Sequence, residues 1–333
     1  MRKEIGSEFW SIPLSDNTNA IFNENVNWFI SGRSALEAII LQIKNKIGAD
    51  IVYLPSWCCD SMIIPFLKHG INVKFYPVYL HKNELVQDIP QTKRNELLLL
   101  IDYFGYTSGV NCSDRNAIVI RDLTHSIFSK TYSDADYYFG SLRKWCGFKT
   151  GGFAIGLNAE QLPSDDAYIA LRTTAMEAKA KYILGENDGK GFLKTFAEAE
   201  EYLEQSSIAG ADSREIGLSD KIDVDFIKAK RRENATVLME AFPNLLVFKT
   251  LQKKDCPLFV PIVIPERERD ELRRYLIAKE IYLPIHWPIS SYHNLDNKTK
   301  DIYNREISLV CDQRYGKEDM YRMIEAINDF FKR

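Results

Sequence analysis

The stretch ELLLLIDYFGYTSGVNCSDRNAIVIRD, residues 96–122, holds two short apolar runs, and each run ends in an aspartate. Apolar residues follow one another in both runs without the alternation of a half-exposed strand, as expected of strands that are covered on both faces. Similar runs occur at 51–54, 73–78 and 153–157, and helical or loop segments separate them. The pattern predicts an α/β fold with a mostly parallel central sheet and helices on both faces.

A change of pattern near residue 244 predicts a second domain. The chain is helical and charged from about 160 to 240, and a separate α+β pattern begins after Pro243. We therefore expect a large domain over 1–244, which includes an N-terminal segment at 1–25, and a small C-terminal α+β domain over 245–333. In the small domain the sequence predicts strands at 258–265 and 281–288 and helices at 267–280 and 317–333.

The composition is that of an ordinary soluble globular protein. The 333 residues are 45% hydrophobic and 27% charged, with a net charge of −3, so lysines and arginines form no excess that would favour nucleic acid. No run approaches the roughly 18 apolar residues that cross a bilayer, and MRKEIGSEFW at the N-terminus lacks the apolar core of a signal peptide. We expect six free thiols in a reducing cytoplasm, no bound metal and no membrane or nucleic-acid partner.

A second stretch, SLRKWCGFKTGG at 141–152, suggests three chemistries. Ser141 and Lys144 form S-x-x-K, and Lys149 begins K-T-G, but serine penicillin-recognising enzymes place these motifs far apart, so here they cannot face each other across a cleft. A Walker loop requires a glycine directly before its lysine, and Phe148 stands there. A Schiff base between a lysine and a carbonyl cofactor is the chemistry that is left.

Pyridoxal phosphate (PLP) also requires an anion beside its ring nitrogen and hydrogen-bond donors for its phosphate, and the chain has candidate residues for both. Asp122 ends a central strand, at the edge where α/β sheets bind ligands, and a carboxylate there would keep the pyridine ring protonated. Residues 31–34 lead into a segment with helical apolar spacing, whose free N–H groups would bind a phosphate. Alternatively, Ser34 and Glu37 form only a capping box.

With these residues in place, the chain resembles the DegT/DnrJ/EryC1/StrS family of sugar aminotransferases, which have the type I PLP-transferase fold. The family motif G-T-x-A-L is matched by residues 32–36, and D-A-A-H/Q by residues 122–125. The family lysine stands seven residues before a Gly-Gly pair, the distance from Lys144 to Gly151-Gly152. Further matches, in the family's order, lie at 52–78, 231–234, 285–288 and 308–324, so the resemblance covers nearly the whole chain.

The resemblance implies a role for each matching residue. Lys144 would form the Schiff base and carry the proton between the substrate Cα and C4′ of the cofactor, Asp122 would pair with the pyridinium nitrogen, and His125 would lie beside the ring near its phenolic oxygen. A gapless match puts Cys59 at the position that stacks on the ring, with Trp57 as an alternative. The phosphate would be held, mainly through backbone amides, by Gly32, Arg33 and Ser34.

Some positions depart from the family pattern. The family's phosphate-binding serine stands five residues before the lysine, where this chain has Phe139, so Ser141 would have to replace it. Thr150 takes the place of the acidic residue before Gly-Gly, and REIGLSDKIDVD at 214–225 replaces the N-Y-R segment that reaches the neighbouring subunit's sugar site. The cofactor machinery is therefore expected to be retained, and the substrate pocket, about 206–225, to be altered.

The resemblance implies a PLP-dependent aminotransferase. It would move an amino group from an amino acid, L-glutamate by analogy, to a nucleotide-linked keto sugar in surface polysaccharide or related biosynthesis. Such enzymes are homodimers with active sites at the interface. Two alternatives stay open: a PLP-dependent dehydratase or lyase of the same fold, and a non-catalytic relative that serves as a binding module.

Four residues in or near these motifs also have structural interpretations. His125 could be an ordinary packed histidine, and Arg33 could form a surface salt bridge. Arg231 and its neighbour Arg232 have the pattern of a solvated helix face.

Overall fold

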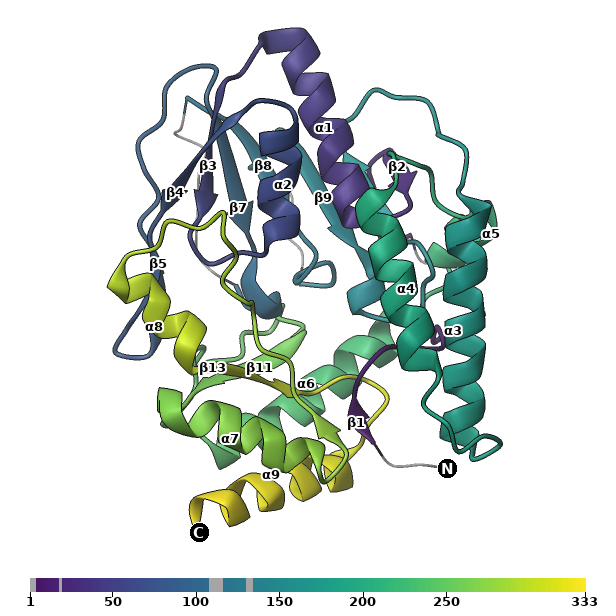
Figure 1. The fold of residues 1–333 in the computed structure, drawn as a ribbon, viewed down its shortest axis with the longest axis vertical. Coiled ribbons are helices and arrows are strands. Elements are labelled where there is room, and N and C mark those ends of the chain that lie inside the picture. Colours follow the sequence, from purple (N-terminus) through teal and green to yellow (C-terminus); the bar gives the residue numbers. More distant parts are fainter. Residues whose placement is uncertain (1–3, 18–19, 108–115, 130–133) are drawn as a thin grey trace.

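The computed structural model describes residues 4–17, 20–107, 116–129 and 134–333, and a seven-stranded sheet forms its centre (Figure 1). The strands lie in the order β2–β10–β9–β8–β7–β3–β4, and β10 alone runs antiparallel to its neighbours. The predicted α/β fold with a mostly parallel sheet is therefore confirmed. The strands are β2 (Val26–Phe29), β3 (Ile51–Pro55), β4 (Asn72–Tyr76), β7 (Leu97–Ile101), β8 (Ile118–Asp122), β9 (Tyr137–Ser141) and β10 (Gly152–Ile155).

One face of the sheet is covered by α1 (Gly32–Ile47) and α2 (Asp60–Lys68). The predicted helical spacing is confirmed, because the apolar stripe of α1 is buried against β9, β10 and β2. Helix α1 ends at Gly48, which has the left-handed conformation (φ 69°) that a side chain would strain. This helix therefore starts at the sheet edge where β9 ends and points its N-terminus toward that edge.

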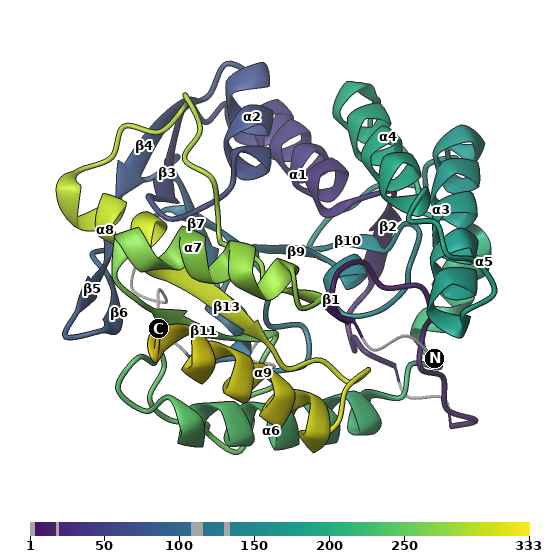
Figure 2. The same cartoon turned by 60° about the horizontal axis from the view of Figure 1, so that its bottom comes forward.

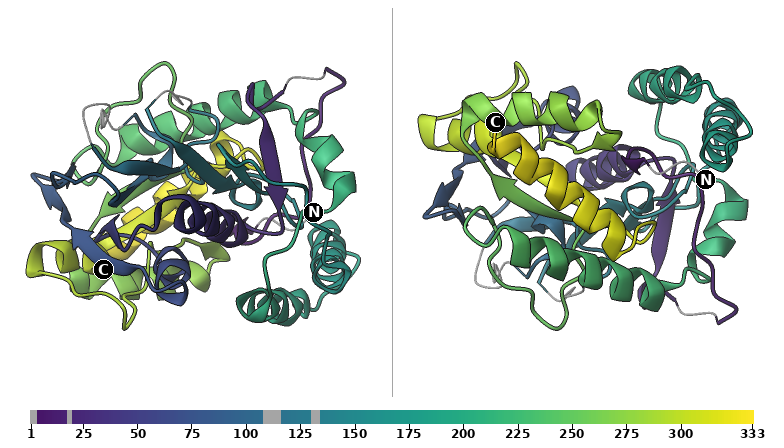
Figure 3. Two further views of the ribbon diagram at one scale, coloured as in Figure 1. Left: turned by 90° about the horizontal axis from the view of Figure 1, so that it is seen from above. Right: turned by 90° about the horizontal axis from the view of Figure 1, so that it is seen from below.

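The opposite face is covered by the N-terminal segment, by loops after β8 and β9, and by the start of α6 (Val224–Ala241). Tyr138 and Phe153 project from the sheet into this second core, where they pack near Phe22, Trp145 and Ile227. Figure 3 (left) shows α6 and the pair α1–α2 on opposite sides of the sheet. Short elements near these loops are the 3₁₀ turns η1 (Tyr103–Gly105) and η2 (Leu142–Lys144), and α5 (Ser213–Ser219).

The C-terminal part forms an α+β layer across one end of the sheet. It contains β11 (Phe259–Val263) and β13 (Glu306–Val310), which pair antiparallel, and helices α7 (Glu266–Ile277), α8 (Asn297–Arg305) and α9 (Lys317–Phe331). Helix α6 packs on α9 and β11, and its Ala235 and Leu238 belong to the core of this layer. The division of the chain at residue 244 stays a prediction.

Two predicted strands are shorter than the sequence suggested. Of 281–288 only β12 (Ile281–Tyr282) is a strand, because Pro284 and Pro288 have no N–H to donate. The predicted strand at 73–78 is divided at Pro77 into β4 and β5 (Val78–His81), and β5 forms a hairpin with β6 (Glu84–Gln87).

Helices α3 (Asp166–Leu184) and α4 (Phe192–Gln205) form a hairpin beside the sheet (Figure 2). The short strand β1 (Ile5–Gly6) lies between this hairpin and the C-terminal layer. It pairs in parallel with β12, and Glu4 next to it forms a buried ion pair with Lys179 of α3. The N-terminal segment thus connects the helical hairpin with the C-terminal layer. In the described residues no helix is long and apolar enough to span a lipid bilayer.

Candidate active site

A cavity of about 250 Å³ lies at the carboxyl ends of β8 and β9 and at the N-terminus of α1. Three of its residues are fixed by adjoining backbone elements, because Asp122 ends β8, Ser141 ends β9 and Lys144 ends the turn η2 that follows. The structure brings together seven of the nine residues predicted for the site. The lining includes Gly32, Arg33, Cys59, Asp122, His125, Ser141 and Lys144.

Asp122 is buried, with 1% of its surface exposed, although it lines the cavity. Its Oδ1 accepts a hydrogen bond of 2.7 Å from the N–H of Thr124, and within the described part of the chain it has no ion-pair partner. Burial raises the pKa of this carboxyl to about 6. A cationic group in the cavity would compensate for the lost hydration, and a protonated ring nitrogen is such a group.

The two lysines of the 141–152 stretch have different environments. The ammonium of Lys149 lies 3.0 Å from an oxygen of Asp212 and 3.9 Å from one of Glu215, so it is committed to ion pairs. Lys144 is exposed, lines the cavity and makes no hydrogen bond or ion pair with any residue the structure describes. The amine available for chemistry is therefore that of Lys144.

The N-terminus of α1 presents free backbone donors to the cavity. Ser31 is the N-cap, because its Oγ accepts a hydrogen bond from the N–H of Ser34, and the first intrahelical bond joins Ala35 N–H to the Ser31 carbonyl. The N–H groups of Gly32 and Arg33 precede both bonds and are the donors that a helix start leaves for an anion. A Cβ at position 32 would lie 3.2 Å from the Gly140 carbonyl, so glycine allows the helix to approach β9 closely.

The alternative capping-box interpretation is wrong. It requires Ser34 as the N-cap and Glu37 as its reciprocal partner, whereas Ser31 is the N-cap. The Glu37 carboxylate instead lies 2.6 Å from the ammonium of Lys68 and 2.8 Å from the ring of His69. Ser34 does not line the cavity; its hydroxyl lies 3.2 Å from that of Ser31.

His125 lines the cavity as a buried, neutral imidazole, since burial holds its pKa well below the usual value. Its Nδ1 accepts a hydrogen bond of 3.4 Å from the N–H of Phe104, which leaves the proton on Nε2. The ring lies 5.6 Å from that of Trp287, at an interplanar angle of 22°. Trp287 also lines the cavity, and sequence reasoning missed it although the IHWP segment was matched to the family pattern.

Of the two residues considered for stacking on the ring, only Cys59 reaches the cavity. Its Sγ lies 2.8 Å from the hydroxyl of Ser61, and burial raises its thiol pKa. Trp57 is fully buried behind the cavity wall, where it stacks on Tyr103 at 4.9 Å and donates a hydrogen bond of 2.5 Å to the His286 carbonyl.

Two arginines had structural interpretations as well. Arg33 forms the surface ion pair that was one of its two expected environments, with 3.9 Å between its Nη2 and Glu204. This ion pair is long and is the only one of Arg33 in the described residues, so the guanidinium stays available to a bound anion. Arg231 is 1% exposed, and the prediction of a solvated helix face is wrong for it. Its guanidinium lies over the ring of Trp145, 4.6 Å from the centroid.

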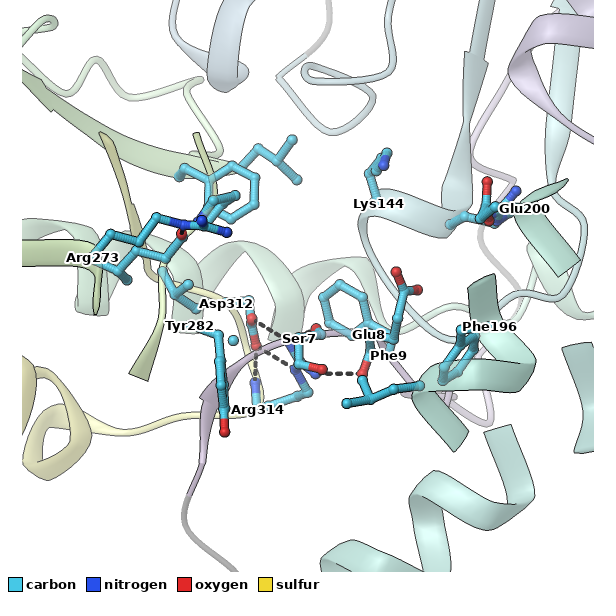
Figure 4. A pocket seen from close by; sticks show the side chains of 18 of the residues that line it. Ser7, Glu8, Phe9, Lys144, Phe196, Glu200, Arg273, Tyr282, Asp312 and Arg314 are labelled. Atoms are coloured by element: carbon cyan, nitrogen blue, oxygen red, sulfur yellow. Dashed lines mark hydrogen bonds and ion pairs between the residues drawn. The ribbon is translucent and has the colours of Figure 1, made fainter. Parts of the chain in front are cut away.

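A second cavity, of about 610 Å³, adjoins the first and shares Arg143, Lys144 and Glu200 with it (Figure 4). Its walls come from the N-terminal residues 6–9, from α4 and from the C-terminal layer. Figure 4 shows Lys144 between Arg273 on one side and Glu200 on the other. Arg143 forms an ion pair with Glu200, and this pair lies where the two cavities meet. A molecule in the larger cavity would therefore have access to the Lys144 amine.

Solved structures share this fold. The Helicobacter pylori aminotransferase PseC, involved in the biosynthesis of pseudoaminic acid, superposes with a TM-score of 0.65 at 15% identity, over 98% of this chain and all of that one. A DegT/DnrJ/EryC1/StrS aminotransferase from Brucella abortus superposes with a TM-score of 0.60 at 13% sequence identity, over 92% of this chain and 86% of that one. NtdA from Bacillus subtilis, solved with bound pyridoxamine phosphate (PMP), superposes with a TM-score of 0.60 at 14% sequence identity, over 94% of this chain and 74% of that one.

The resemblance inferred from the motifs is therefore confirmed at the level of the fold, which is that of type I PLP transferases. No protein-family model matches the chain, and no curated protein matches it in sequence. Among the described residues, no group of histidine, cysteine, aspartate or glutamate side chains could hold a metal ion.

Proposed function

We propose that this protein is a PLP-dependent aminotransferase that acts on a keto sugar. The observation that carries the proposal is that one cavity contains the buried carboxylate of Asp122 and the amine of Lys144, and that neither has an ion-pair partner among the described residues. The fold agrees, because it is shared with a sugar aminotransferase from Micromonospora echinospora and with a putative one from Streptococcus pneumoniae, which was solved in its PMP form.

The cavity residues fit PLP at each of its charged parts. The N–H groups of Gly32 and Arg33, with the hydroxyl of Ser141, would hold the phosphate, and Asp122 would pair with the ring nitrogen. When bound, the cofactor supplies an electron sink for the carbanion that proton loss from a substrate leaves behind. Asp122 keeps that sink effective by favouring the protonated ring.

Lys144 performs the proton transfers in this proposal. The Nζ of Lys144 would hold the cofactor as a Schiff base and, when free, would accept a proton from the substrate carbon and donate it again. The Arg143–Glu200 ion pair lies next to it and occupies Arg143, which would otherwise compete for anionic groups near Lys144. The Nε2–H of His125 would donate a hydrogen bond to the phenolic oxygen of the cofactor ring.

Several finer features extend the proposal. The amino donor would be L-glutamate, and the acceptor a nucleotide-linked keto sugar used in surface polysaccharide or related biosynthesis. The enzyme would work in the cytoplasm as a homodimer whose active sites lie at the subunit interface. The similarity in fold to sugar aminotransferases supports a sugar as the acceptor.

An absorption spectrum tests the proposal. Protein purified with PLP should show the absorbance band of a lysine-bound cofactor, and Lys144→Ala should lack any borohydride-reducible band. Adding L-glutamate should then convert the wild-type spectrum to that of PMP. A retained reducible band in Lys144→Ala would exclude the central assignment. A band that glutamate leaves unchanged would favour the dehydratase or lyase alternative, and no band at all the binding module.

A further inference from the structure

The larger cavity carries more positive than negative charge. Its lining contains five cationic side chains and three carboxylates. Two of the cations are neutralised, because Arg314 binds both carboxylate oxygens of Asp312, at 2.9 and 2.7 Å, and Arg143 pairs with Glu200. Within the described residues, Arg231 and Arg273 have no ion-pair partner, and neither has Lys144.

Arg231 is a buried guanidinium held in one orientation. Its Nε donates to Gln313 Oε1 at 2.8 Å, and its Nη1 donates to the carbonyls of Pro257 and Leu258, at 3.2 and 2.9 Å. The remaining nitrogen, Nη2, is buried, and no residue that the structure describes offers it a hydrogen-bond acceptor. Because a buried guanidinium without an anion is destabilising, the free edge of Arg231 indicates that an anion belongs beside it.

Arg273 supplies a second cation from another wall of the cavity. It projects from α7, and its Nε donates a long hydrogen bond, 3.3 Å, to the Leu283 carbonyl. The rest of its guanidinium has no partner in the part of the chain that the structure describes. Figure 4 shows Arg273 across the cavity from Glu200, with Lys144 between them. An anion bound near Arg231 and Arg273 would thus lie in the cavity that the reacting amine also lines.

We infer that this cavity binds an oxyanionic group of a substrate, a carboxylate or a phosphate, through Arg231 and Arg273. The inference rests on the proposed function, which requires a substrate to reach Lys144. It adds that one end of that substrate is acidic and is held by the C-terminal layer while the other end meets the amine. The group belongs either to the amino donor or to the acceptor, since both chemistries present the same charged oxygens to a guanidinium.

Calorimetric titration with two probes, glutarate and inorganic phosphate, tests the site. Wild-type protein should bind at least one of them, and the uncharged diamide of glutarate should not bind. Arg273→Gln should weaken that binding about tenfold or more, as expected for a lost charge-assisted hydrogen bond. Arg274→Gln is the matched control, because Arg274 is the next residue on α7 and does not line the cavity.

Arg231 is tested by a pair of variants. Arg231→Gln should lose binding, and Arg231→Lys should restore part of it by returning the charge. Equal melting temperatures would show that the variants are folded. If Arg231→Gln does not fold, Arg273→Gln still tests the site, because Arg273 is exposed. The inference is overturned if wild-type protein binds neither probe, or if Arg274→Gln weakens binding as much as Arg273→Gln.

The source of the acid group follows from the half-reaction with L-glutamate. If Arg273→Gln raises the glutamate concentration needed for half-maximal conversion about tenfold, the donor supplies the group. If the half-reaction is unchanged while probe binding is lost, the acceptor supplies it. Probe binding is measured by heat and needs no cofactor band, so a failure of the proposed PLP chemistry and a failure of this anion site give different results.

Discussion

The carboxylate of Glu215 accepts two hydrogen bonds from Thr150, one of 2.9 Å from its backbone N–H and one of 2.7 Å from its hydroxyl. Its other oxygen accepts the N–H of Lys149 at 2.7 Å. The motif resemblance led us to expect an acidic residue at position 150, where the chain has threonine; Glu215, from α5, brings a carboxylate to this loop from a distant part of the chain. The loop leads into β10, and its Gly151 carbonyl accepts the N–H of Leu142 at the start of the turn that carries Lys144.

Replacing Glu215 with alanine should therefore destabilise the protein. Two backbone N–H groups and one hydroxyl would lose a shared acceptor in a buried site, which we expect to lower the free energy of unfolding by about 3 kcal/mol. Urea denaturation measures this change. Glu201→Ala, on the exposed side of α4, serves as the control and should change stability by less than about 0.5 kcal/mol. Equal stability of the two variants would contradict the role given to Glu215.

Lys149→Ala tests whether Lys149 has a structural role and Lys144 the reactive one. Because its ammonium is paired with Asp212, the substitution leaves a buried carboxylate with one cation fewer and should lower the melting temperature. The absorbance band of the cofactor should persist, since Lys144 is unaffected. Lys144→Ala should behave in the opposite way, with a normal melting temperature and no band. Loss of the band in Lys149→Ala alone would reverse the assignment.

The sequence predicted the middle of the central sheet because several of its strands, such as β7 and β8, are almost continuously apolar. The run at 96–102 became β7, whose five residues are all buried, and the aspartate that ends the next run lies at the predicted sheet edge. Strand β9 was not among the named runs, because its sequence YYFGS contains glycine and serine and is not continuously apolar. Local sequence therefore identified the edge where the site lies and the residues that end its strands.

Contacts between distant segments account for what the sequence did not reveal. Arg231 lies in a charged helical pattern that predicts exposure, yet it is buried because Gln313, 82 residues later, and the Trp145 ring form its surroundings. Trp57 follows a strand and was a reasonable candidate to face the cofactor. It is turned into the core by Tyr103 and by the carbonyl of His286, 229 residues away. The sequence around a residue does not reveal contact partners that lie so far away along the chain.

Ser31→Ala should weaken the N-terminus of α1. The hydroxyl of Ser31 accepts the N–H of Ser34, and loss of an N-cap of this kind costs about 1 kcal/mol of stability. Because the same helix start is proposed to hold the phosphate, the variant should also bind PLP more weakly. Thermal unfolding and a cofactor titration measure the two effects. Ser31→Asp should keep the cap but repel the phosphate, so a variant that recovers stability without recovering PLP affinity is the expected signature.

Asp122→Asn should change how stability depends on pH in protein freed of its cofactor. Burial raises the pKa of Asp122 in the folded state to about 6, above its unfolded value of about 3.9. The folded state therefore holds the proton more tightly, so the cost of this group is absent well below pH 4, grows between pH 4 and pH 6 and levels off above pH 6. At pH 7 the penalty approaches about 3 kcal/mol, and asparagine, which cannot ionise, should avoid it.

Urea denaturation of both proteins at pH 4 and pH 7 measures this effect. The stability of Asp122→Asn relative to the wild type should increase from pH 4 to pH 7. This gain should be smaller when PLP is bound, because a protonated ring nitrogen would compensate the charge of Asp122, which only the wild type has. An equal difference between the two proteins at both pH values would show that Asp122 does not carry the pH dependence. A gain that PLP leaves unchanged would show that Asp122 does not face the ring nitrogen.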